Sequence, residues 1–243
     1  MKSTVQRSDQ PLATNGAKAQ ESMRDRIKAI ATDLFIQHGY RGVSFGDIAT
    51  ELGITRANIH YHFGNKQNLL DELLEEYVDG TLERMRKIWR NETDTFADKL
   101  EGIIAFNRER YLRFNQRGDT GNHWSLITRM RNDSDAIGER SRRTLQKFGL
   151  TLSSDVEAGV QLAIKRGEMG GNVPIDQIVL QAVSIVNAAG TIAQDAGNFD
   201  RLDALYRAFL GTVQAAYGGK PKAKSNANTR TKRDASRAHN LSR

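Results

Sequence analysis

The sequence contains no cysteine and only three prolines among its 243 residues. The absence of thiols excludes a disulfide framework and any thiolate metal site. No apolar run approaches the roughly 20 residues that cross a bilayer, and the N-terminal stretch MKSTVQRSDQPLATNG lacks the apolar core of a signal peptide. We therefore expect a cytoplasmic protein.

The formal net charge of +7 is unevenly distributed along the chain. Between Gly218 and Arg243, eight lysines and arginines stand against one aspartate, so this tail carries the whole excess and the rest of the chain is formally neutral. The overall charge is therefore weak evidence for a nucleic-acid-binding face. The N-terminal arm (1–20) and the basic tail (219–243) contain few apolar residues, which predicts disorder. The tail either attracts DNA without sequence preference or simply keeps the protein soluble.

Apolar residues recur mainly at helical spacing, which predicts an all-α fold. We expect a first helix between Ser22 and Gly39, two short helices within 43–63, and a long helix from Lys66 to Arg90. Further helices are expected over 95–117, 125–131, 135–166 and 175–196, with a last one capped by Asp200. This pattern indicates an N-terminal helix-turn-helix domain (21–81), joined by the long helix to a helical-bundle domain (82–218).

Residues 44–63 have the local signals of two short helices around a tight turn. Ser44 with Asp47 three residues later forms the pattern of a capping box, and Thr55 is placed to cap the second helix. Gly53 lies between them, where a left-handed residue is favoured. This arrangement is typical of a helix-turn-helix motif, whose second helix lies in the DNA major groove.

From Arg24 to Asp79 the sequence resembles the DNA-binding domain of the tetracycline-repressor (TetR) family. The motifs that carry the resemblance are Ala31, Leu34-Phe35, His38-Gly39-Tyr40, Asp47-Ile48-Ala49, Leu52-Gly53-Ile54, Tyr61-His62-Phe63, Asn65-Lys66 and Leu69-Leu70. The resemblance implies a homodimeric, ligand-responsive transcriptional repressor that binds a pseudo-palindromic operator. It also implies a small-molecule effector that enters the C-terminal domain and moves the long fourth helix.

The candidate DNA contacts lie on and around the second helix of the motif; they are Ser44, Thr55, Arg56, Ala57, Asn58, His60, Tyr61, His62 and Lys66. Arg56 is suited either to guanine O6/N7 or to a phosphate. Lys66 lies in the first turn of a helix, where the dipole favours anions, and we expect it to hold a DNA phosphate. His60 and Gly46 depart from the family pattern, in which a tyrosine and a longer polar residue are usual.

The C-terminal half gives weaker predictions. Aromatic and polar residues near a helix break are either a ligand pocket or ordinary packing; they are Phe106, Arg110, His123, Trp124, Arg129 and Asn132. Apolar positions of the last two helices are candidates for the dimer interface; they are Val179, Ala182, Val186, Ala189, Ala193, Leu205, Phe209 and Val213.

The sequence has no legible catalytic motif, and we predict neither enzymatic activity nor a cofactor. His60 and His62 diverge around a helix, so they do not converge on a metal ion. Two alternatives remain: a DNA-coating protein that uses the basic tail, and a helical enzyme with an appended DNA-binding domain.

Overall fold

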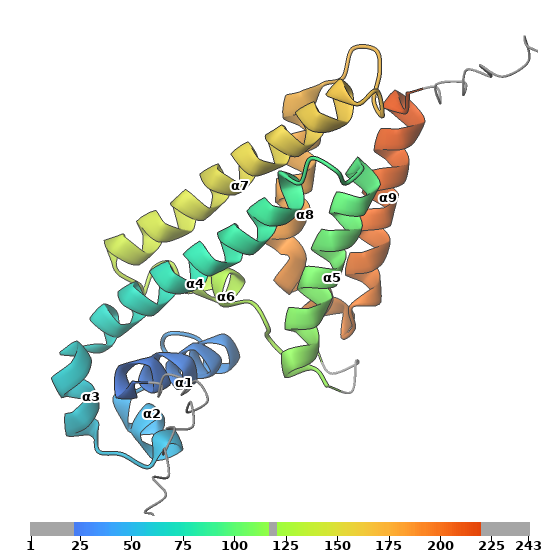
Figure 1. The fold of residues 1–243 in the computed structure, drawn as a ribbon. Helices are drawn as coiled ribbons and strands as arrows, with labels where there is room; N and C mark the ends of the chain where they lie inside the picture. The colour runs from blue at the N-terminus through green and yellow to red at the C-terminus, as the bar shows by residue number, and fades with distance from the viewer. Residues whose placement is uncertain (1–21, 117–120, 220–243) are drawn as a thin grey trace, which may run out of the picture.

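The computed structural model describes residues 22–116 and 121–219, so the predicted arm and the tail beyond residue 219 lie outside the described residues. Within these ranges every named element is a helix, and the all-α prediction is confirmed (Figure 1). The helices are α1 (Met23–His38), α2 (Phe45–Leu52), α3 (Arg56–Phe63), α4 (Lys66–Trp89), α5 (Phe96–Phe114), α6 (Leu126–Asn132), α7 (Glu139–Lys165), α8 (Ile175–Ala196) and α9 (Asp200–Tyr217).

The first four helices begin where the sequence predicts them, each at a residue whose side chain accepts a backbone N–H; these caps are Ser22, Ser44, Thr55 and Asn65. At α2 the capping box is complete, because the Asp47 side chain also accepts the N–H of Ser44. Gly53 follows α2 in the left-handed region, with φ of 65°. The two helices it separates have eight residues each.

The long helix α4 runs without a break across residue 81, the predicted domain boundary, and lies beside α7 (Figure 1). The two helices meet closely near the end of α4. A Cβ on Gly159 of α7 would lie 2.8 Å from the ring of Trp89, so the close approach depends on glycine. Asp155 is buried beside it and binds both Arg86 and Arg90 of α4.

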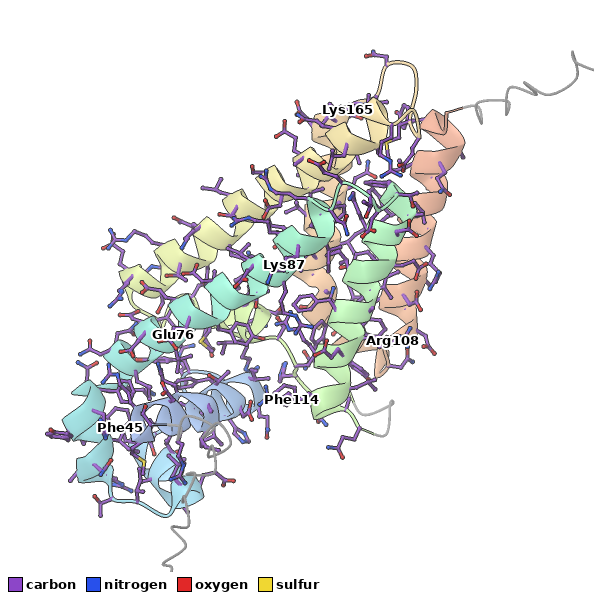
Figure 2. All side chains as sticks on the ribbon, in the orientation of Figure 1. Phe45, Glu76, Lys87, Arg108, Phe114 and Lys165 are labelled. Atoms are coloured by element: carbon purple, nitrogen blue, oxygen red, sulfur yellow. The ribbon has the colours of Figure 1, made fainter. Side chains whose placement is uncertain are left out.

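The remaining helices complete the bundle, in which side chains fill the space between the ribbons (Figure 2). α5 packs against α4, α7 and α9, while α8 packs against α6, α7 and α9. Two boundaries differ from the prediction. α7 begins at Glu139 because the residues before it form turns, and Asp200 is the first residue of α9 instead of its cap.

α8 is more hydrophobic than expected from the sequence, in which we found no segment apolar enough to span a membrane. Among the described helices it alone is long and apolar enough to cross a membrane, with mean hydropathy of 1.3 over an 18-residue window, of which 39% is buried. Polar residues interrupt the helix, so its apolar residues form no continuous run. Length and composition of this kind are also those of a helix at the centre of a bundle.

Candidate functional site

The outer face of α3 carries the exposed side chains of the helix-turn-helix motif. Arg56, Ala57, His60 and Tyr61 are exposed, whereas Ile59 and Phe63 on the opposite side are buried. Tyr61 is 86% exposed, the highest value among the large hydrophobic side chains of the described residues. The structure therefore places four of the predicted DNA contacts on one surface.

Arg56 lies directly over the start of α2. A Cβ on Gly46 would come within 2.5 Å of Arg56 Nη2, so the missing side chain at residue 46 leaves room for the guanidinium. The Ser44 hydroxyl is the main cause of a lowered pKa of Asp47, and Arg56 lowers it further. No carboxylate within the described residues forms a salt bridge with Arg56. Its side chain thus lies at the junction of the two short helices, near Asp47 but without a salt bridge to it.

Two of the predicted DNA contacts also interact with the protein itself: His60 forms a hydrogen bond and a ring contact, and Asn58 is partly covered by its neighbours. His60 Nδ1 lies 2.8 Å from the carbonyl oxygen of Gly64, which only accepts, so Nδ1 carries the proton and Nε2 is left outward. The His60 ring also meets the edge of Phe45 at 4.8 Å. Asn58 is half-buried, and its side-chain oxygen has no hydrogen-bond partner.

Arg24 holds the end of α3 against the helices behind it. Its guanidinium binds Glu72 of α4 and the backbone carbonyl of His62, and it lies 4.2 Å from the centre of the Phe63 ring. The His62 side chain is half-buried and contacts the Tyr61 ring edge-on at 5.3 Å. These contacts fix the orientation of α3 from its C-terminal end.

Lys66 has a different environment from the one predicted. Its ammonium donates to the carbonyl oxygens of Tyr40 at 2.8 Å and Val43 at 2.9 Å, and it lies 4.2 Å from the centre of the Tyr40 ring. Burial lowers the pKa of this lysine. The ammonium therefore ties the start of α4 to the α1–α2 loop, a structural role that competes with the predicted phosphate contact.

A cavity of about 300 Å³ lies between α1, α4 and α5. It collects three of the predicted pocket residues, Phe106, Arg110 and Trp124. The other residues around it are Ile36, Tyr77, Gly80, Thr81, Arg84, Arg113 and Phe114. Sequence analysis missed these, although Tyr77, Gly80, Thr81 and Arg84 follow helical spacing on α4, as Phe106, Arg110, Arg113 and Phe114 do on α5.

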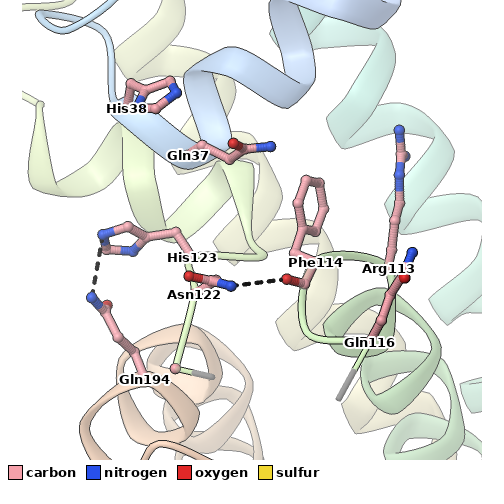
Figure 3. Close-up of a pocket in the computed structure, with 9 residues that line it drawn as sticks. Gln37, His38, Arg113, Phe114, Gln116, Asn122, His123 and Gln194 are labelled. Atoms are coloured by element: carbon pink, nitrogen blue, oxygen red, sulfur yellow. Dashed lines mark hydrogen bonds between the residues drawn. The ribbon is translucent and has the colours of Figure 1, made fainter. Parts of the chain in front are cut away.

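A second cavity, of about 650 Å³, adjoins the first through Arg113 and Phe114 and contains His123 (Figure 3). Arg129 donates to His123 Nε2 at 2.9 Å, and the Gln194 amide lies 3.2 Å from the same atom. Burial and the Arg129 charge lower the pKa of His123. Arg129 therefore supports the cavity wall from behind, whereas Asn132 is exposed at the end of α6 and lines neither cavity.

The residues just after α6 contact the residues just after α1. Asp133 accepts the backbone N–H of Tyr40 at 2.7 Å, and Arg41 pairs with Asp135 at 2.6 Å. A Cβ on Gly39, whose φ is +76°, would lie 2.6 Å from Asp133 Oδ2 and 2.9 Å from Arg129 Nε. Glycine is required there twice over, by conformation and by space.

The predicted dimer-interface residues need correction. Six of the eight are at most 9% exposed in the single chain, because α8 and α9 turn these side chains toward their own bundle; they are Ala182, Val186, Ala189, Ala193, Phe209 and Val213. Val179 is half-buried, and only Leu205 faces outward, at 37% exposed. Apolar residues at helical spacing predict a buried helix face, but they do not tell whether that face is buried by the same chain or by a second copy.

Comparisons with known proteins extend these observations. Residues 27–73 match the sequence model of the family "Bacterial regulatory proteins, tetR family". The HTH-type transcriptional repressor KstR2 of Rhodococcus jostii (strain RHA1) is 27% identical over 99 residues, which cover 41% of this chain and 48% of that protein. The match thus spans less than half the length of this relative.

Solved structures match over most of the chain. A TetR transcriptional regulator from Legionella pneumophila has a TM-score of 0.65 and 21% identity, covering 80% of this chain and 99% of that one. A TetR-family transcriptional regulator from Agrobacterium tumefaciens has a TM-score of 0.69 and 20% identity, covering 78% and 96%. At these identities the likeness concerns the fold.

The structure defines a helix-turn-helix protein whose long fourth helix leads from the motif into a separate helical bundle. Residues 27–73 carry the sequence pattern of the TetR family of bacterial regulatory proteins, and the described fold as a whole is like that of solved TetR-family structures.

Proposed function

We propose that this protein is a sequence-specific DNA-binding transcriptional regulator, and specifically a cytoplasmic repressor. The observation that carries the proposal is the outer face of α3, where an unpaired arginine and an 86% exposed tyrosine stand on a helix fixed from both ends. A helix presented in this way fits the major groove. Arg56 and Tyr61 would contact bases, and the capped helix starts at Ser44 and Thr55 would face phosphates.

The repressor would act as a homodimer on a pseudo-palindromic operator, since two copies related by a twofold axis present two α3 helices to successive major grooves. The outward sides of α8 and α9 are the surface proposed for pairing. Leu180 is 67% exposed and Leu205 is 37% exposed. A monomer mass at micromolar concentration in solution would contradict this pairing.

A small-molecule effector would regulate DNA binding through the contacts between the two domains. The cavity between α1, α4 and α5 touches the N-terminal domain directly through Ile36. The hydrogen bond from Tyr40 to Asp133 connects α6 to the same domain. An occupant that shifts α4 or α6 would therefore change the separation of the two α3 helices, with reciprocal effects on effector and DNA affinity.

Operator binding tests the proposal. Footprinting on the promoter region of the protein's own gene, with and without residues 220–243, distinguishes a discrete operator from a general coating of the DNA by the tail. Arg56→Ala is expected to relax specificity at one operator position at a cost of about 1–3 kcal/mol. Arg26→Ala, an exposed arginine of α1, is the matched control. Equal binding of the wild type and Arg56→Ala to every sequence would refute base recognition by this face.

A further inference from the structure

The cavity between α1, α4 and α5 is lined by positive charge without any acidic residue. Three arginines take part in its wall. Arg84 pairs with Glu109 at 2.6 Å, and Arg113 pairs with Asp33 at 2.7 Å; both arginine side chains are more than half exposed. Arg110 lies deeper, half-buried, and forms no salt bridge within the described residues.

Aromatic rings surround the Arg110 guanidinium in place of a carboxylate. The centres of the Phe106 and Trp124 rings lie 5.2 and 5.5 Å from it. The Tyr77 ring lies at 5.4 Å, and the Tyr77 hydroxyl accepts a hydrogen bond from Arg110. These rings supply flat apolar walls and hold the cation in place, but they do not neutralise it; an acidic group near it is Glu109, whose salt bridge is with Arg84.

The wall behind Arg110 contains another buried donor, the Trp124 indole. Trp124 is 2% exposed, and its indole N–H has no hydrogen-bond partner. Trp124 and Arg110 also border an internal void of about 10 Å³, with Arg131 on its other side. Arg131 has one hydrogen bond, to Asn187 Oδ1 at 2.8 Å, and burial lowers its pKa. A buried donor such as the Trp124 indole N–H is rarely left unsatisfied, and an acceptor-rich ligand in the cavity would satisfy it.

We propose that this cavity binds an aromatic carboxylate, with its carboxylate on the Arg110 guanidinium and its ring among Phe106, Tyr77 and Trp124. A cationic ligand would be repelled by Arg110, which forms no salt bridge within the described residues, and a neutral one would leave Arg110 without an anionic partner. The inference rests on the proposed function, because it names the chemical class of the effector. The bound acid would touch Ile36 of α1 and Gly80 of α4, and thereby both the N-terminal domain and the helix that carries it.

The test compares acids with their neutral isosteres. Benzoate, phenylacetate and 2-naphthoate, and the amide of each, are titrated into the full-length protein by calorimetry. At least one carboxylate is expected to bind at least about 10-fold more tightly than its amide, as charge-assisted hydrogen bonds require. Three carboxylates that bind no more tightly than their amides would overturn the proposal.

Two variants locate the binding. Arg110→Gln is expected to weaken the preferred carboxylate by about 10-fold to 100-fold and to remove its advantage over the amide. Arg108→Gln is the matched control, because Arg108 lies on the same helix, packs on the Phe199 ring and pairs with Asp203, outside the cavity. Equal loss in both variants would show that Arg110 has no specific role and would overturn the assignment.

Gly80→Leu fills the cavity without removing any charge. A Cβ on Gly80 meets no heavy atom within 4 Å, so folding is expected to survive, as a thermal unfolding curve verifies. Loss of carboxylate binding in this variant supports the site, and unchanged binding overturns it.

Operator binding is measured in a separate experiment, so that a failure of the proposed ligand class can be told apart from a failure of the proposed regulatory function. A carboxylate that binds through Arg110 but leaves the operator complex intact would retain the site and contradict effector control. If the protein binds its operator but does not prefer carboxylates over their amides, the proposed regulatory function stands and the proposed ligand class is refuted.

Discussion

The N-terminal helices and the helical bundle are held together by different means. Each of α1 to α4 begins at a side-chain cap, whereas α7, α8 and α9 begin without one. α2 and α3 have eight residues each, and isolated helices of that length are unstable in water. The bundle instead relies on helices of 27, 22 and 18 residues that bury long apolar stripes.

This difference shows where each domain is vulnerable. In the N-terminal domain a few polar contacts determine the orientation of α3, because α2 and α3 are short and bury little surface. In the bundle the close approach of helices matters more than any single polar group. We therefore expect the loss of one polar contact to cost the most stability in the N-terminal domain, and one added methyl group at a helix contact to cost the most in the bundle.

The largest effect is expected from Lys66→Met, which removes the ammonium that binds the Tyr40 and Val43 carbonyls. Hydrogen bonds from a charged donor contribute about 1.5–3 kcal/mol each, and partial solvent access reduces the sum, so we expect a loss of about 2–3 kcal/mol in urea unfolding. Operator affinity should fall while its salt dependence stays unchanged, because no phosphate contact is lost.

Lys87→Met provides the control for this substitution, since Lys87 lies exposed on the same helix and, among the described residues, pairs with Glu83 alone. It should change the free energy of unfolding little. A reduced salt slope in Lys66→Met would restore the phosphate contact that the sequence predicted.

A smaller loss of stability is expected in the bundle from Gly159→Ala, and its cause is steric crowding instead of a lost polar contact. The added methyl group would lie 2.8 Å from the Trp89 ring and 3.1 Å from the Trp89 carbonyl oxygen, so α4 and α7 must move apart. Overpacking of this kind costs about 1–3 kcal/mol. Gly149→Ala on the same helix meets nothing within 4 Å and should instead gain up to about 1 kcal/mol. If both variants are stabilised in thermal unfolding, the close contact does not limit the packing.

The same contrast explains how far the sequence predicts the structure. Caps and turns depend on residues within a few positions of each other, and Ser44, Asp47 and Gly53 suffice to predict α2. The partners of Lys66 lie 23 and 26 residues earlier in the chain, in a loop whose position depends on tertiary packing. The dipole argument for a phosphate is sound locally, but it does not include these carbonyl oxygens.

The candidate cavity was predicted only in part for the same reason. Phe106, Arg110 and Trp124 stand out as aromatic and basic residues near a helix break, and all three line it. Asn132 has the same character but is exposed. Which of these residues meet depends on how α5 packs against α1 and α4, and no local pattern in the sequence contains that information.

The smallest effect, and the finest test of the comparison, concerns a device that both domains share. α2 and α5 each begin with a complete capping box, formed by Ser44 with Asp47 and by Thr95 with Asp98. The hydroxyl of the cap residue is the main cause that lowers the pKa of each aspartate below its ordinary value of 3.8. The stabilisation is therefore full above the unfolded-state pKa and is lost as the pH falls through the lower folded-state pKa.

Asp47→Asn and Asp98→Asn should each destabilise the protein more at about pH 5 than at about pH 3, where the wild-type carboxylates are partly protonated. Urea unfolding at the two pH values measures this difference. Only Asp47→Asn should also weaken operator binding at neutral pH, because α2 positions α3 whereas α5 lies outside the N-terminal domain. Equal operator affinity in the two variants would mean that a cap in the short helices matters no more than one in the bundle, and the contrast between the domains would then rest on packing alone.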